Sequence, residues 1–256
     1  MAEEKRQFPT EMISLPSKGY LYPEDNPLSS GEVEIKYMTA REEDILTSQN
    51  LIQKGIVLDK LLESLIVSDI NLDDVLLGDK NAILLASRVL AYGKDYEFEY
   101  TDPVSEDKKV ESVDLTSFEP KKVDYKKWTK GVNEHEFILP NSKKVITFKL
   151  TTQGDDKAVD SQLKALSKIS KGGIQPEITT RLKQQIVAVD GNRDRSIVNK
   201  FVDNELLSRD SFEFRNYVKT ISPDIDMTTI IELDDGTEEE ITVPVTVTFF
   251  WPDSGV

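Results

Sequence analysis

The chain has 256 residues, of which 47 are acidic and 32 are basic, so its formal net charge is −15. It contains no cysteine and a single histidine, His135. These counts exclude disulfides, thiolate catalysis and zinc sites with cysteine ligands, and one histidine cannot form a two-histidine metal centre. The acidic composition predicts a protein that repels nucleic acid and anionic membranes, and the apolar runs are far shorter than the ~20 residues that a membrane helix needs.

The charge is unevenly distributed along the chain. Residues 157–200 hold 4 acidic and 9 basic residues, whereas residues 203–256 hold 13 acidic and 3 basic ones. The basic middle is typical of a solvated helix face, and it is also suited to docking on an acidic protein. The first ten residues contain acids and no apolar stretch, so we expect no secretory signal.

Residues 1–31 predict an extended arm. Four prolines interrupt this stretch and forbid a long helix. Phe8, Tyr20 and Tyr22 are aromatic anchors that either pack on the protein's own body or insert into a partner.

Residues 32–94 predict a strand followed by a helical layer. Alternation over 31–38 indicates a strand with one buried face. Thr39 and Glu42 have the spacing of a capping box, which predicts a helix to about Gln53. Apolar residues at helical spacing predict a second helix over 56–67, and we expect Asp79 to cap a third that ends at Gly93.

Residues 95–152 predict two β-hairpins, formed by 95–101 with 109–115 and by 136–140 with 144–150. Between them, the stretch 121–130 holds five lysines around Tyr125 and Trp128. Basic residues beside aromatics are found at nucleic-acid contacts. The negative field of the chain favours an exposed loop anchored by the tryptophan instead.

Residues 153–222 predict a second helical block, and residues 223–256 predict a hairpin with an aromatic tail. The expected helices cover 155–171, 176–190, 193–206 and 210–220. Asp235–Gly236 lies between the alternating stretches 227–233 and 238–250, which is a strong hairpin signal. The predicted fold class is therefore α+β, a helical body with peripheral antiparallel β-hairpins and an extended N-terminal arm.

Signatures of catalysis are absent from the sequence. It has no phosphate-binding Walker loop and no dinucleotide glycine fingerprint. Asp155 and Asp156 could belong to a two-carboxylate metal site, which keeps a metal-dependent hydrolase as a remote alternative, but a helix N-terminus explains them better. His135 has no matching nucleophile elbow. We therefore predict a binding or assembly protein that is not an enzyme and has no cofactor and no metal.

Three ordered patterns resemble the baseplate hub assembly proteins of T-even-like contractile-tail bacteriophages. They are Leu15–Gly19 with the tyrosines that follow, Met38–Leu46 with Arg88 and Tyr92–Gly93 downstream, and the terminal Phe249–Pro252. The resemblance spans almost the whole chain. It implies a role in building the hub through binding to other phage hub proteins, in the host cytoplasm during assembly. The alternative is a permanent structural subunit of the virion baseplate.

The resemblance also implies which residues bind partners and what holds the hairpins. Some members carry paired cysteines in stretches that correspond here to 101–105 and 232–236, so this chain must hold those hairpins by packing and turn chemistry. Aromatic and aliphatic anchors are common interface hot spots. These side chains either bind a partner or fill the protein's own core. The candidate partner-binding residues are Leu15, Lys18, Tyr20, Tyr22, Phe249, Phe250 and Trp251.

Overall fold

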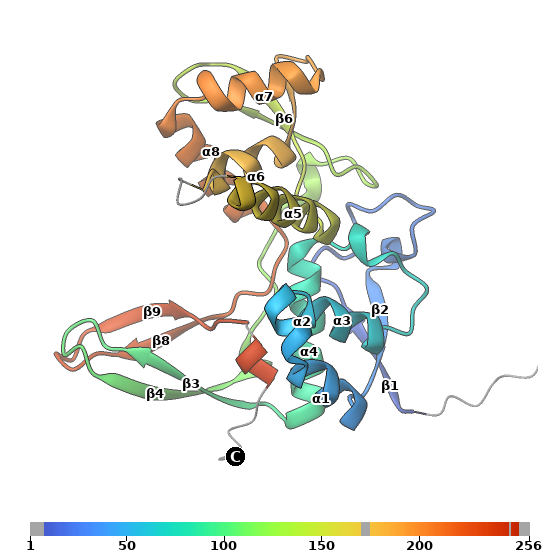
Figure 1. Cartoon of the computed structure of the whole chain (residues 1–256), viewed down its shortest axis with the longest axis vertical. Helices are drawn as coiled ribbons and strands as arrows, with labels where there is room; N and C mark the ends of the chain where they lie inside the picture. Colours follow the sequence, from blue (N-terminus) through green and yellow to red (C-terminus); the bar gives the residue numbers. More distant parts are fainter. Residues whose placement is uncertain (1–7, 170–174, 246, 251–256) are drawn as a thin grey trace, which may run out of the picture.

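A computed structural model describes residues 8–169, 175–245 and 247–250. The described residues form a mixed α+β fold with small antiparallel sheets of two or three strands. Figure 1 shows three parts: a lower body around α4 (Leu77–Tyr92), an upper lobe that contains the three-stranded sheet, and two hairpins that extend sideways from the body. From here on, the arm means these two hairpins and not the N-terminal residues 1–31. This arrangement confirms the predicted α+β class with antiparallel hairpins, while residues 1–7 of the predicted N-terminal arm lie outside the described residues.

The elements follow one another along the chain as helices and strands of modest length. The other α-helices are α1 (Ala40–Thr47), α2 (Gln49–Lys54), α3 (Val57–Leu65), α5 (Gln153–Ile169), α6 (Glu177–Gln185), α7 (Arg195–Asn204) and α8 (Ser208–Ile221). The strands are β1 (Thr10–Ser14), β2 (Glu32–Lys36), β3 (Asp95–Thr101), β4 (Lys108–Asp114), β5 (His135–Ile138), β6 (Val145–Phe148), β7 (Ile186–Val189), β8 (Thr228–Glu232) and β9 (Glu238–Thr242). Short 3-10 helices cover Pro27–Ser30, Leu72–Asp74, Leu115–Ser117, Tyr125–Lys127 and Val247–Phe250.

The lower body surrounds α4, whose Ile83, Leu84 and Leu85 are buried. Strands β1 and β2 pair antiparallel beside it, and Val33 and Ile35 of β2 point into the core as the alternating pattern predicts. Helix α4 begins at Leu77, so the prediction that Asp79 caps it is wrong. The Asp79 carboxylate instead binds a distant turn, which is described below.

The capping box at Thr39 is confirmed, but the helix that it starts is shorter than expected. The Glu42 carboxylate accepts a hydrogen bond from the Thr39 amide at 2.8 Å. The predicted helix to Gln53 is divided at Ser48, which adopts extended backbone between α1 and α2. Glu42 is buried and also accepts bonds from Lys36 and Ser64, so the start of α1 is tied to β2 and α3.

The upper lobe corrects the prediction of one helix over 176–190. Helix α6 ends at Gln185, and the next four residues form β7, which pairs antiparallel with β6. The apolar run Ile186–Val189 satisfies its backbone in the sheet while burying three of its four side chains. The expected hairpin of β5 and β6 thus becomes a three-stranded sheet, against which Phe214 of α8 packs edge-on to Phe148.

The arm consists of the hairpin β3–β4 and the hairpin β8–β9, as predicted from their alternation. The C-terminal strand is shorter than expected, because β9 ends at Thr242, just before Pro244, and the chain then enters the 3-10 helix at Val247–Phe250. Figure 1 shows the two hairpins running side by side to their tips.

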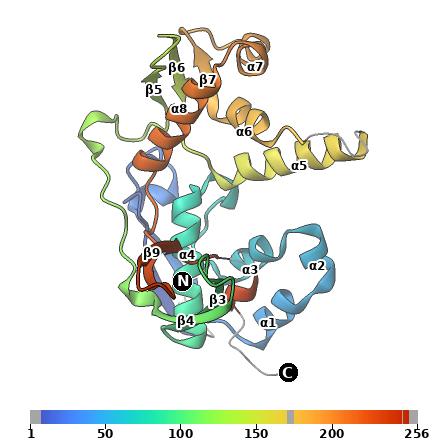
Figure 2. The same ribbon diagram turned by 90° about the vertical axis from the view of Figure 1, so that its left-hand side faces the viewer.

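An irregular segment, residues 115–134, connects the arm to the upper lobe and runs along one side of the molecule (Figure 2). Its aromatic side chains anchor it: Tyr125 lies 4.9 Å from Tyr20, and Trp128 lies 4.4 Å from His135, measured between ring centroids. The row of rings continues through Phe148 into the upper lobe. The connecting segment is thus a loop anchored by its aromatic side chains, Trp128 among them.

Candidate interaction surfaces

The turn at residues 15–22 is built around the carboxylate of Asp79. One oxygen of Asp79 accepts from the Ser17 amide at 2.9 Å, and the other accepts from the hydroxyls of Ser17 and Tyr22, each at 2.6 Å. Asp79 is fully buried and has only these neutral donors, so burial raises its pKa above the usual value in spite of the hydrogen bonds. The motif that begins at Leu15 therefore fixes the N-terminal region to α4.

This turn leaves one of its candidate residues on the surface. Leu15 and Tyr22 are buried, and Tyr20 is half-buried with its hydroxyl donating to the Trp128 carbonyl at 3.0 Å. Lys18 is exposed and has a positive φ of 52°. Gly19 follows with a φ of 70°, and a Cβ there would lie 2.4 Å from the Ser29 carbonyl oxygen, so the close turn requires glycine.

The C-terminal aromatics also belong to the core. Phe249 and Phe250 are fully buried, and Phe249 packs edge-on to Tyr96 at the base of the arm. The buried Arg88 guanidinium donates to the Phe249 carbonyl at 2.9 Å and to the Gly93 carbonyl at 3.1 Å. Trp251 lies outside the described residues.

Of the two alternatives for these side chains, four of the seven candidates show burial in the protein's own core. Leu15, Tyr22, Phe249 and Phe250 fill the protein's own core, because each gains more by removing its apolar surface from water than by remaining exposed. The Tyr20 hydroxyl donates to the Trp128 carbonyl of the same chain. Among the six described candidates, only Lys18 is exposed.

Asp155 and Asp156, which were considered for a metal site, form ion pairs with Lys149 and Arg181. Asp155 accepts from Lys149 at 2.6 Å and from Gln184 at 2.8 Å, and Asp156 accepts from Arg181 at 2.7 Å. Burial acts to raise the pKa of Asp155, but these bonds outweigh it and leave the pKa below its usual value. Within the described residues, no group of three or more metal-ligating side chains is found.

His135 lies between aromatic rings, with its Nε2 buried and without a hydrogen-bond partner. Burial lowers its pKa, because a charged imidazolium is poorly solvated among Trp128 and Phe148. No serine or threonine hydroxyl binds it in the described structure. His135 therefore acts as a packed aromatic side chain.

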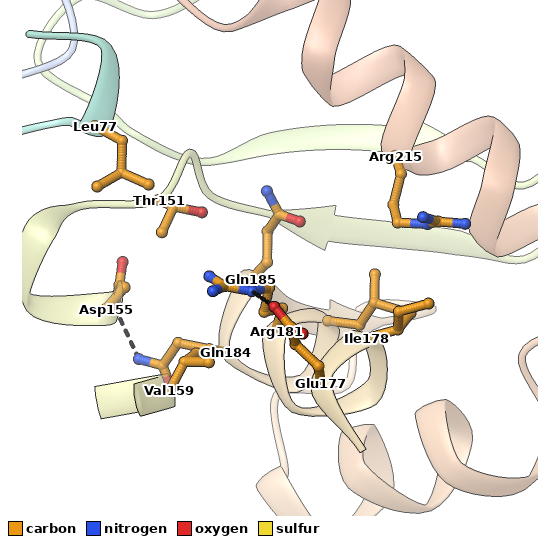
Figure 3. Close-up of a pocket in the computed structure, with 11 residues that line it drawn as sticks. Leu77, Thr151, Asp155, Val159, Glu177, Ile178, Arg181, Gln184, Gln185 and Arg215 are labelled. Carbon is orange, nitrogen blue, oxygen red and sulfur yellow. Dashed lines mark hydrogen bonds and ion pairs between the residues drawn. The ribbon is translucent and has the colours of Figure 1, made fainter. Parts of the chain in front are cut away.

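A cavity of about 250 Å³ lies where α5, α6 and α8 meet (Figure 3). Apolar side chains line much of it, among them Leu77, Val159 and Ile178. Arg181 at its wall is held by Asp156 and Glu177, and Arg215 enters from α8. Two pairs of lining side chains bind each other: Gln184 donates to Asp155 at 2.8 Å and Arg181 donates to Glu177 at 3.2 Å.

The tips of the two arm hairpins are joined by a polar network that the sequence analysis missed. Asp102 accepts from the amides of Val104 and Ser105 in its own turn and, at 3.0 Å, from the Asp234 amide in the other hairpin. The Lys109 ammonium lies 2.9 Å from Asp102 and also pairs with the Asp234 carboxylate. The hydrogen bond from the Lys109 ammonium lowers the pKa of Asp102 to about 2.

Packing along the arm supports this network, as the sequence analysis expected. The faces of the hairpins that are turned inward carry Tyr96, Phe98, Val113 and Ile231, all buried. Asp102 supplies the expected turn chemistry. The additional ion pairs of Lys109 had no signal in local spacing, because Asp102 and Asp234 are 132 residues apart.

The outer surface of the arm is acidic and carries exposed apolar residues. Its strands and tips, residues 95–114 and 228–242, hold 14 acidic and 2 basic residues, a net charge of −12. Val104, Val110 and Ile230 are each more than half exposed. An apolar side chain on a projecting element contributes little to its own fold, so this surface is the best candidate for binding another protein.

Comparison with known proteins gives no relative: no family model matches the chain, and neither a curated protein nor a solved structure is significantly similar to it. Among the described helices, none has the length and apolar character needed to cross a membrane.

Proposed function

We propose that this chain is a non-enzymatic protein-binding factor in the assembly of a phage tail baseplate hub. The observation that carries the proposal is the paired-hairpin arm, which extends from the body and shows Val104, Val110 and Ile230 to solvent. Such an element is suited to reach a partner while the body stays folded around α4. The acidic surface would select a partner with basic groups and disfavour others.

The arm also supports the resemblance on which the hub assignment rests. The stretches 101–105 and 232–236 are those where some family members carry paired cysteines, and in this chain they lie at neighbouring tips. Asp102, Lys109 and Asp234 join these tips through ion pairs. Two hairpins joined in this way would serve as the binding module of the proposed factor.

Replacing the exposed apolar residues of the arm tests the proposal. The Val110→Ser/Ile230→Ser variant should keep the wild-type melting temperature, because both side chains are exposed, and should lose most of the tail protein that co-purifies with the tagged chain from phage-infected cells. The matched control is Val132→Ser/Ile197→Ser, two exposed apolar residues outside the arm. Equal recovery of tail protein with both variants would contradict the proposal.

Mass spectrometry of purified virions separates an assembly factor from a permanent hub subunit. An assembly factor that leaves after its task should be absent from the particle but present with hub proteins in the host cytoplasm. A stoichiometric amount in virions would instead establish the structural subunit.

A further inference from the structure

Six lysines lie together on a surface that contrasts with the rest of this acidic chain. They are Lys18 on the turn and Lys121, Lys122, Lys126, Lys127 and Lys130 on the connecting segment, here called the lysine strip. Several lysines elsewhere, among them Lys36, Lys94 and Lys149, contact a carboxylate within 2.7 Å. Others, such as Lys54, Lys168 and Lys200, are exposed and have no carboxylate at ion-pair distance in the described structure. Within the described structure, no lysine of the strip has a carboxylate partner at ion-pair distance.

The lysine strip is held in place and is not a free loop. The Lys121 amide donates to the Asp224 carbonyl at 2.8 Å, the Tyr125 hydroxyl donates to the Pro16 carbonyl at 3.0 Å, and the Gly131 amide donates to the Tyr20 carbonyl at 2.9 Å. An open hollow of about 480 Å³ beside it is lined by Lys121, Lys122 and Lys219 together with the carboxylates of Glu119 and Asp226. Ammonium groups held at fixed positions are suited to bind carboxylate side chains.

The arm of the same chain carries the complementary charge. Its net charge is −12, whereas the remaining residues hold 33 acidic and 30 basic side chains, a net charge of only −3. In Figure 2 the arm faces the viewer and the connecting segment runs along the left side, so the two surfaces point in different directions. Within one molecule, the arm and the strip therefore serve separate contacts.

We infer that the arm of one copy docks on the lysine strip of a second copy, head to tail, in a contact that competes with the hub partner proposed above for the same arm. Contact between two arms would place like charges together, so a symmetric arm-to-arm dimer is disfavoured. Because the two surfaces are different, the contact is heterologous and builds a ring or an open chain of copies. At physiological salt, where the Debye length is about 8 Å, long-range repulsion between copies is largely screened while direct contacts persist.

Sedimentation of the full-length protein with charge-reversed variants tests this contact. The strip variant is Lys122→Glu/Lys126→Glu/Lys127→Glu, and the arm variant is Glu238→Lys/Glu239→Lys/Glu240→Lys; all six side chains are exposed. The control is Lys54→Glu/Lys168→Glu/Lys200→Glu, which gives the same net charge as the strip variant from exposed lysines outside the strip.

We expect the wild type and the control to form species larger than the 29.0 kDa monomer, with dissociation at about 0.5 M NaCl. Each of the other two variants should associate more weakly than the wild type, because the substitutions change the net charge of the arm from −12 to −6 and that of the six strip positions from +6 to 0. A wild type that stays monomeric at high concentration overturns the inference, as does undiminished association of either variant.

A labelled single-stranded oligonucleotide serves as the competing probe. Oligonucleotide binding by a monomeric wild type, lost in the strip variant but not in the control, would assign the lysine strip to nucleic acid and overturn self-association. No binding of this probe, together with weaker association of the strip and arm variants than of the control, supports the head-to-tail contact.

Discussion

The turn at Asp79 and the arm tips at Asp102 are each held together by one aspartate, but the two carboxylates have different partners. In both places one aspartate accepts several hydrogen bonds and joins segments that are far apart in sequence. Asp79 is surrounded by neutral donors inside the body, and burial raises its pKa. Asp102 at the arm tips is also buried, but its partners include the Lys109 ammonium, whose hydrogen bond lowers the pKa of Asp102 to about 2.

The comparison shows that the number of donors does not decide the charge state of a carboxylate. A buried carboxylate with only neutral partners keeps a large desolvation cost, whereas a charged hydrogen bond from an ammonium group can outweigh that cost. Removing the Asp79 carboxylate should therefore lower the free energy of unfolding strongly, because its donors stay buried without an acceptor. The ion pairs of Lys109 at the arm tips should contribute little to that free energy.

Asp79→Ala should produce the largest effect. It leaves the Ser17 amide and the hydroxyls of Ser17 and Tyr22 buried without their acceptor, so we expect a loss of about 3 kcal/mol in the free energy of unfolding. Urea denaturation measures it. Asp69→Ala, at an exposed position, should change the free energy by less than about 0.5 kcal/mol. A loss below about 1 kcal/mol for Asp79→Ala would show that water replaces the carboxylate.

The pH dependence of the two aspartates should have opposite signs. Folded Asp79 binds its proton at a higher pH than the unfolded chain, so its contribution to stability rises as the pH falls through its raised pKa towards 3.8. The contribution of Asp102 is present above pH 3.8 and is lost as the pH falls towards about 2.

Urea denaturation of Asp79→Ala and Asp102→Ala between neutral and acidic pH measures this difference. The gap in unfolding free energy from wild type should widen for Asp79→Ala and close for Asp102→Ala as the pH falls. Gaps that change in the same direction would contradict the contrast drawn between the two sites.

Lys109→Met should have the smallest effect on stability and a local effect on motion. The melting temperature should stay close to wild type, while the Asp234 amide, which donates to Asp102 at 3.0 Å, should exchange its hydrogen faster. Lys108→Met is the matched control, since Lys108 lies 3.8 Å from Glu99 with both side chains exposed. Unchanged exchange at Asp234 would mean that packing alone joins the tips.

Local sequence patterns predicted most helices and strands, but they did not predict contacts between residues far apart in the sequence. The capping box at Thr39 and the hairpin signal at Asp235–Gly236 depend on neighbouring residues, so the sequence was enough for both. Strand β7 was missed because the choice between helix and strand at Ile186–Val189 is made by pairing with β6. Asp79 was taken for a cap because its true partners, Ser17 and Tyr22, are 62 and 57 residues away.

The candidate site was predicted less well than the fold. The conspicuous aromatic and aliphatic motifs turned out to be core, since large apolar side chains are as useful inside a protein as at an interface. A count of charge by hairpin would have singled out the arm, because residues 95–114 and 228–242 hold 14 acidic and only 2 basic residues. The network of Lys109 depends on two hairpin tips meeting, which no local spacing encodes.

The separation of charge between arm and body also makes the molecule an electric dipole. An approaching basic surface would exert a torque on it and turn the arm forward before any atoms touch. Encounters with such a surface would then begin in one orientation, so the rate of productive association should fall steeply as added salt shortens the range of that torque.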